Sequence, residues 1–143
     1  MIDVYNQLLK ELNSFVSDSK YEPFVVKNYT SASTHFPIIS CSLSNFTDTD
    51  FCTIDMIEQH QEMYLTIDIY TKSKIIDNEE FASQAINDEL TELVMKFFSS
   101  KKMKMTLCRP TPNADKNIMR RTIQYQGLVS LARGNIIRRW NYV

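Results

Sequence analysis

The chain has 143 residues, of which 43% are hydrophobic and 23% are charged, a composition typical of one globular domain that buries its own core. With 2 glycines and 4 prolines, it is neither a low-complexity nor a linker-rich protein. No apolar run approaches the roughly 18 residues of a membrane span, and the N-terminus lacks the pattern of a signal peptide. We therefore expect a cytoplasmic protein in which Cys41, Cys52 and Cys108 are buried, reduced thiols.

The net charge of −1 hides a strong division along the chain. Residues 1–100 contain 6 Lys and Arg against 16 Asp and Glu, whereas residues 101–143 contain 10 Lys and Arg against one acid, Asp115. Such asymmetry indicates either an anionic partner or a surface that meets its electrostatic opposite.

The first half of the chain begins with apolar residues at helical spacing, which predict an amphipathic helix over 2–16. Pro23 then places the next strand at a sheet edge, and the sequence of 45–50 is typical of a turn. Residues 59–61 are expected to connect two further strands. The predicted strands of this half are 24–29, 37–43, 53–58 and 62–72.

The second half begins with Asn78, Glu79 and Glu80, which we expect in the first turn of a second helix. Its predicted buried stripe is Phe81, Ala85, Leu90, Leu93, Val94, Phe97 and Phe98. A strand over 103–108, closed by 109–113, precedes a long strand over 118–131 in which Gly127 marks a bulge or a close backbone approach. A tight turn at 133–135 and a return strand over 136–142 complete the chain.

This order of elements predicts one α+β domain over residues 1–143, with two helices packed on a largely antiparallel β-sheet and a long C-terminal hairpin. No catalytic, metal or cofactor signature stands out. His35 and His60 lie far apart, and no two cysteines have metal-ligand spacing. With Gly127 and Gly134 as the only glycines, a phosphate-binding loop is excluded. Asp68, within a strand, is interpreted as a solvated or interface acid, and we expect no enzyme activity and no cofactor.

The basic C-terminal third offers the strongest functional signal. Its predicted contact residues are Arg109, Arg120, Arg121, Arg138, Arg139 and Trp140. Three interpretations stay open: the arginines bind phosphates while Trp140 and Tyr142 stack on bases, they form a solvated face, or they form one basic ridge that docks on a neighbouring copy. The complementary acidic side would consist of Asp48, Asp50, Asp55, Glu58 and Glu62. Head-to-tail contact between two different patches closes into a ring when the rotation permits.

The order of elements also resembles a known family. The features that carry the resemblance are the N-terminal helix, the strand entered through Phe36-Pro37-Ile38-Ile39, the strand Tyr64-Leu65-Thr66-Ile67-Asp68-Ile69-Tyr70, the helix near Glu79, and the segment 120–129 that runs into Asn135-Ile136-Ile137-Arg138-Arg139. Together they are similar to the tail terminator, or tail completion, and neck proteins of tailed phages and phage tail-like particles. The resemblance spans nearly the whole chain and is one of element pattern rather than of a signature motif.

The resemblance implies a structural virion protein without catalytic residues. Such a protein assembles as a homo-oligomeric ring, often a hexamer, which caps the tail tube, stops its polymerisation and joins the tail to the head connector. The expected partners are other copies of the chain, the tail tube protein and the head–tail connector or stopper protein, in the virion tail or neck after assembly in the host cytoplasm. Neither a membrane nor a sequence-specific nucleic acid is expected. The alternatives are a small nucleic-acid-binding module and another head–tail connector or tube protein.

Overall fold

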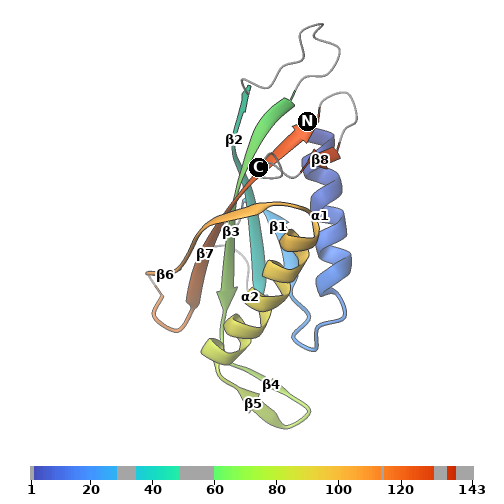
Figure 1. The fold of residues 1–143 in the computed structure, drawn as a ribbon. Coiled ribbons are helices and arrows are strands. Elements are labelled where there is room, and N and C mark those ends of the chain that lie inside the picture. Colours follow the sequence, from blue (N-terminus) through green and yellow to red (C-terminus); the bar gives the residue numbers. More distant parts are fainter. Residues whose placement is uncertain (1, 29–34, 49–59, 114, 131–134, 138–143) are drawn as a thin grey trace, which may run out of the picture.

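The fold is known from a computed structural model, which describes residues 2–28, 35–48, 60–113, 115–130 and 135–137. It is an α+β fold, as predicted, with two helices, one six-stranded sheet and a small two-stranded sheet (Figure 1). The elements are α1 (Ile2–Val16), β1 (Phe24–Lys27), β2 (Ile38–Asp48), β3 (His60–Thr71), β4 (Lys74–Ile76), β5 (Glu79–Phe81), α2 (Ser83–Ser100), β6 (Lys104–Thr111), β7 (Met119–Ser130) and β8 (Asn135–Ile137).

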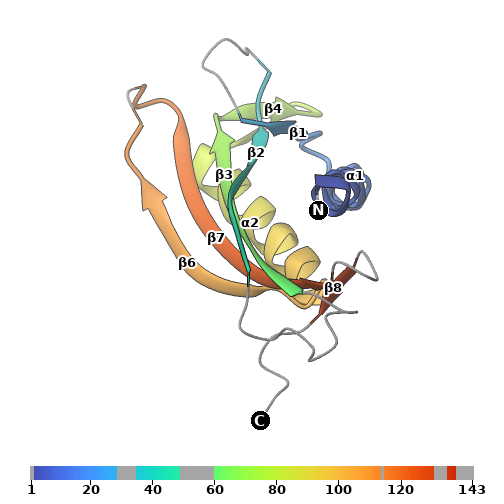
Figure 2. The ribbon, with the colours of Figure 1, turned by 90° about the horizontal axis from the view of Figure 1, so that it is seen from above.

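The large sheet has the strand order β1-β2-β3-β7-β6, and β8 pairs with the end of β7. Every pair is antiparallel except β1 with β2, which is parallel, so the prediction of a largely antiparallel sheet is confirmed. β1 lies at the edge, as Pro23 indicated. Seen from above, β6 and β7 bend around α2 (Figure 2).

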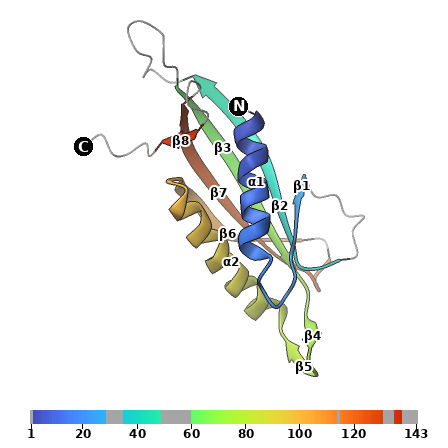
Figure 3. The same ribbon diagram turned by 90° about the vertical axis from the view of Figure 1, so that its right-hand side faces the viewer.

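Both helices cover the same face of the sheet (Figure 3). In α1 the predicted stripe is buried through Tyr5, Leu8, Leu9, Leu12 and Val16. The Tyr5 hydroxyl donates to the carbonyl oxygen of Cys41 in β2 at 3.0 Å, which ties this helix to the sheet. Burial raises the pKa of Tyr5 to about 12, so the hydroxyl keeps its proton and stays a donor at physiological pH.

The second helix begins later than predicted. Glu79 and Glu80 belong to β5 and not to the first helical turn, because Asp77 and Asn78 adopt positive φ angles of 51° and 65° and reverse the chain into a hairpin. α2 then starts at Ser83. The predicted Leu90, Val94, Phe97 and Phe98 are buried, but Ala85 is exposed, and Ile86, one turn before Leu90, is buried on their face.

Several predicted strand ends also need correction. β2 continues through Asp48 where a turn over 45–50 was expected, and His60 and Gln61 belong to β3 rather than to a connection. The expected strand over 53–58 lies outside the described residues. β6 extends to Thr111, because Pro110 sits on the sheet edge where its missing N–H costs no ladder bond.

Of the two expectations at Gly127, a bulge or a close backbone approach, the bulge is wrong. Gly127 pairs in register with the buried Met63, and the glycine leaves space for that side chain. The irregularity lies instead in β6, between Met105 and Leu107. The C-terminal hairpin is confirmed through β8, which pairs Ile137 with Leu128, whereas residues 133–134 of the expected turn and 138–142 of the expected strand lie outside the described residues.

Candidate functional site

Neither described helix packs on the second face of the sheet, and this face carries most of the polar side chains of the central strands. Alternation along β3 directs Leu65 and Ile67 toward the helices and Thr66 and Asp68 to the opposite side. We call this side the helix-free face. Its polar residues on β3 and β7 are Glu62, Tyr64, Thr66, Asp68, Arg120, Thr122, Gln124 and Gln126.

Asp68 is the centre of a buried polar cluster on the helix-free face. It is only 7% exposed, and its Oδ1 accepts hydrogen bonds from Arg120 Nε at 3.0 Å and from Thr122 Oγ1 at 2.5 Å. The Arg120 guanidinium also lies 5.4 Å from the ring centroid of Tyr70, its direct neighbour across the strands. Of the two expectations for Asp68, a solvated or an interface acid, the solvated one is wrong, because the carboxylate is buried and held by these partners.

The pairing with Asp68 changes what Arg120 can do. The hydrogen bond to the carboxylate raises the pKa of Arg120, so the guanidinium stays charged while it is held against β3. Its side chain is 30% exposed and can still present part of its edge to a partner. On the neighbouring strand, the Thr111 and Thr122 hydroxyls lie 2.5 Å apart, which extends the cluster to β6.

Arg121 lies on the other face of the sheet. Its guanidinium contacts α2: Nη2 lies 3.0 Å from Oδ1 of Asp88, and Nη1 donates to Thr91 Oγ1 at 3.3 Å. Arg120 and Arg121 therefore point away from each other, as neighbours in a strand must. The expectation of one basic ridge formed by both is wrong.

Glu62 shares the helix-free face with Arg120. Its carboxylate accepts from the Tyr64 hydroxyl and, at 3.3 Å, from Gln126 Nε2, which also donates to Tyr64 Oη at 3.0 Å. The acidic and basic residues were expected on opposite sides of the protein, and for Glu62 and Arg120 this is wrong. The helix-free face carries both signs of charge.

Arg109 is exposed on β6, directly opposite Thr122 on the helix-free side of the sheet. β6 is also the edge strand, and six of its eight residues are exposed. No ion pair joins Arg109 to any other residue among those that the structure describes. Of the predicted basic residues that are described, Arg109 is the one most available to a partner.

The other predicted site residues lie beyond what is described. Asp48 ends β2 opposite Gln61, and only its backbone is described. Those wholly outside the described residues are Asp50, Asp55, Glu58, Arg138, Arg139 and Trp140. β8 itself pairs with the end of β7 that lies furthest from Arg120 and Arg121.

Cys41 and Cys108 differ from each other in environment. Cys41 is fully buried, and this burial raises the pKa of its thiol to about 12. Cys108 is exposed on β6, so the expectation of a buried thiol there is wrong, because β6 has no layer over most of its side chains. Within the described part of the chain, no group of three His, Cys, Asp or Glu side chains has the arrangement of a metal site.

Several contributors to the helix-free face were not singled out in advance. Tyr64, Gln126 and Thr111 complete its two clusters. They could have been found from the alternation of side chains along a strand: Tyr64 lies an even number of residues from Asp68, and Gln126 from Arg120, so each shares a strand face with that residue.

Comparison with known proteins adds no family to this geometry. No protein-family model matches the chain, and no curated protein matches it in sequence. Neither described helix combines the length and apolar character that crossing a membrane requires.

Proposed function

We propose that the protein is a structural virion component, a ring-forming tail terminator or neck protein that caps the tail tube and joins the tail to the head connector. The proposal rests on the family resemblance and on one structural observation: a mixed-charge, helix-free face that ends in an exposed edge strand, where Arg109 forms no ion pair with the residues that the structure describes. The polar side chains of this face are held in place by hydrogen bonds to one another, and Arg109 is exposed. Such a surface suits a protein partner that binds in one orientation.

The ion pairs of Arg120 and Arg121 favour this proposal over nucleic-acid binding. Each guanidinium already has a carboxylate partner, Asp68 for Arg120 and Asp88 for Arg121. These carboxylates neutralise the positive charge that would otherwise attract phosphates. A phosphate-binding surface relies on several unpaired cations that release counterions on contact. Among the predicted arginines that are described, only Arg109 is of this kind.

The test is a capping assay with the tail tube protein of the same particle. The protein is first sized by light scattering and negative-stain imaging, where rings of several 16.7 kDa subunits are expected. It is then added to polymerising tube protein, which should stop growing. Arg109→Glu should weaken capping about tenfold in the concentration needed, because it reverses an exposed charge of the described contact face.

Lys116→Glu is the matched control, since Lys116 is also exposed and undergoes the same charge change outside β6. Tubes that elongate normally in the presence of wild-type protein would refute the proposal. Strong binding to DNA that falls steeply with salt would favour the nucleic-acid alternative instead.

A further inference from the structure

The β4–β5 hairpin projects beyond the sheet and carries an exposed apolar residue. It extends from the end of the molecule where α2 begins (Figures 1 and 3). Ile75 is 71% exposed, the largest exposure among the large hydrophobic residues in the described part of the chain. Ile75 pairs directly with Glu80 in the neighbouring strand, so the two side chains stand together on the outer face.

The base of the hairpin is firmly attached to the body. Lys74 Nζ donates to the carbonyl oxygen of Tyr21 at 2.8 Å, and the Phe81 ring meets the buried Tyr21 ring edge-on at 5.6 Å. The Lys20 Nζ lies over the Phe81 ring, 4.2 Å from its centroid. With its turn fixed by the αL residues at the tip, the hairpin is a preorganised arm rather than a free loop.

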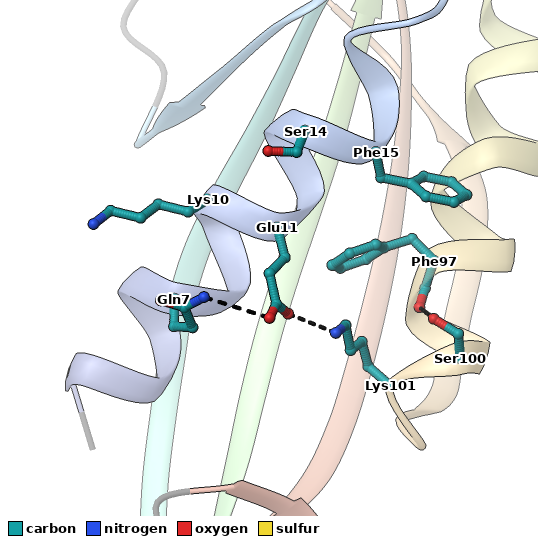
Figure 4. A pocket seen from close by; sticks show the side chains of 8 residues that line it. All are labelled: Gln7, Lys10, Glu11, Ser14, Phe15, Phe97, Ser100 and Lys101. Carbon is teal, nitrogen blue, oxygen red and sulfur yellow. Dashed lines mark hydrogen bonds and ion pairs between the residues drawn. The ribbon is translucent and has the colours of Figure 1, made fainter.

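A groove of about 520 Å³ lies between the two helices (Figure 4). Phe15 and Phe97 form its apolar part, with Phe15 43% exposed. Glu11 and Lys101 bridge the helices at 2.6 Å, whereas the Lys10 side chain extends from the other side of α1, away from Phe15 and Phe97 (Figure 4). No ion pair joins Lys10 or Glu80 to any other residue that the structure describes.

The arm and the groove match in both polarity and charge. Ile75 offers an apolar group to Phe15, and the acidic residue beside it, Glu80, suits a lining that contains Lys10 and Lys101. The hairpin tip adds Asp77 and Glu79, and the groove lining has two lysines against Glu11. A second groove, beside α2, is lined by Asp18, Lys20, Glu89, Glu92, Leu93 and Lys96 and has an acidic excess that would repel the tip.

The arm cannot reach the groove of its own chain. The groove lies at the C-terminal end of α2, about 21 Å along the helix from Ser83 at 1.5 Å per residue. The hairpin precedes Ser83 and points the other way (Figure 1). We propose that the β4–β5 hairpin of one copy docks into the α1–α2 groove of the next copy, which rests on the ring of the proposed function. Such a contact joins two different surfaces and repeats around a closed ring.

Cysteine cross-linking tests the contact directly. Ile75→Cys is combined with Ser14→Cys, an exposed groove residue, in a background where Cys52 and Cys108 are changed to serine. Under mild oxidation the double variant should give a ladder of covalent oligomers. A mixture of the two single variants should give dimers alone. Ile75→Cys with Lys96→Cys, in the acidic groove, is the matched control and should stay monomeric on the gel.

The results separate this contact from the proposed function. Rings that form normally without a ladder would overturn the hairpin contact and leave the terminator proposal standing. A ladder of equal strength in the Lys96→Cys control would also overturn it, because the cross-links would then come from random collisions between chains. A chain that neither associates nor cross-links would overturn both the contact and the ring. A ladder of oligomers from a protein that fails to cap the tail tube would support the contact and refute the terminator function. Thermal unfolding of each variant confirms that the fold is retained.

Discussion

Arg120 and Asp68 form an ion pair across the two central strands, on the face of the sheet that the helices leave open. Arg120 was expected to be a contact residue and Asp68 a solvated or interface acid, whereas in the structure each is a partner of the other. An interface built here would use the partly exposed edge of Arg120 together with the exposed Arg109, which has no ion pair among the described residues.

Removing the Asp68 carboxylate should destabilise the fold. Asp68→Ala leaves Arg120 and Thr122 without their shared acceptor in a buried position, and we expect a loss of about 2 kcal/mol in the free energy of unfolding, measured with urea. Asp88→Ala is the control, because the Asp88 side chain is 53% exposed and its pair with Arg121 should contribute less than about 1 kcal/mol. Equal losses in the two variants would contradict the buried role of Asp68.

Asn87 should be the most sensitive polar residue of α2. It is fully buried, and its Nδ2 donates to the Ile69 carbonyl at 3.0 Å and to Thr71 Oγ1 at 3.3 Å. Asn87→Ala should lower the free energy of unfolding by about 2–3 kcal/mol, because it opens a cavity and leaves these acceptors without a donor. Gln84→Ala, an exposed change one turn earlier, should stay within about 0.5 kcal/mol. A small effect at position 87 would mean that water replaces the amide.

The Glu11–Lys101 pair between the helices should give a small, pH-dependent contribution. The hydrogen bond from Lys101 lowers the pKa of Glu11 below its ordinary value of 4.5. A carboxyl with a lowered folded pKa stabilises the fold above its unfolded pKa and loses this contribution as the pH falls through the folded pKa. Wild type and Glu11→Gln should therefore differ by at most about 1 kcal/mol at pH 7, because both side chains are partly exposed, and should converge as the pH falls below the folded pKa of Glu11.

Raising the salt concentration at pH 7 should narrow that difference as well. A gap between wild type and Glu11→Gln that stays constant over the whole acidic range would show that the glutamine disturbs packing rather than charge.

The described thiols should react at very different rates. In a Cys52→Ser background at pH 8, Cys108 is exposed and should be labelled by a thiol reagent, whereas Cys41 is buried and its raised pKa keeps it protonated. The expected result is one label per chain in the native protein and two in urea. Two labels under native conditions would place Cys41 at an open surface.

The sequence predicted the parts of this fold in which burial follows a regular period. The stripe from Tyr5 to Val16, apart from the exposed Phe15, and the alternation from Met63 to Ile69 were confirmed, because each follows one face of its element. The start of α2 was missed, since Glu79 and Glu80 suit a helix N-terminus and only the backbone shows that Asp77 and Asn78 turn the chain. Asn87 and Thr91 were missed because polar residues on a buried stripe are recognised only through their partners.

The candidate site was harder to predict than the fold. The sequence identified Arg109, Arg120 and Arg121 as a group, but the pairing of β3 with β7 decides which carboxylate each one meets. Asp68 and Thr122 are 54 positions apart in the chain, and no local pattern links them. Charge counts therefore located the basic region without showing which of its charges are neutralised within the fold.

The central position of β3 has a consequence for synthesis of the chain. One neighbour, β2, precedes it, but the other, β7, is translated some fifty residues later. Until Met119–Ser130 has left the ribosome, one backbone edge of β3 stays open beside the apolar row of Met63, Leu65, Ile67 and Ile69. The nascent chain thus carries an unsatisfied, aggregation-prone edge during the interval between the emergence of β3 and that of β7, and the sheet closes only after β7 has emerged.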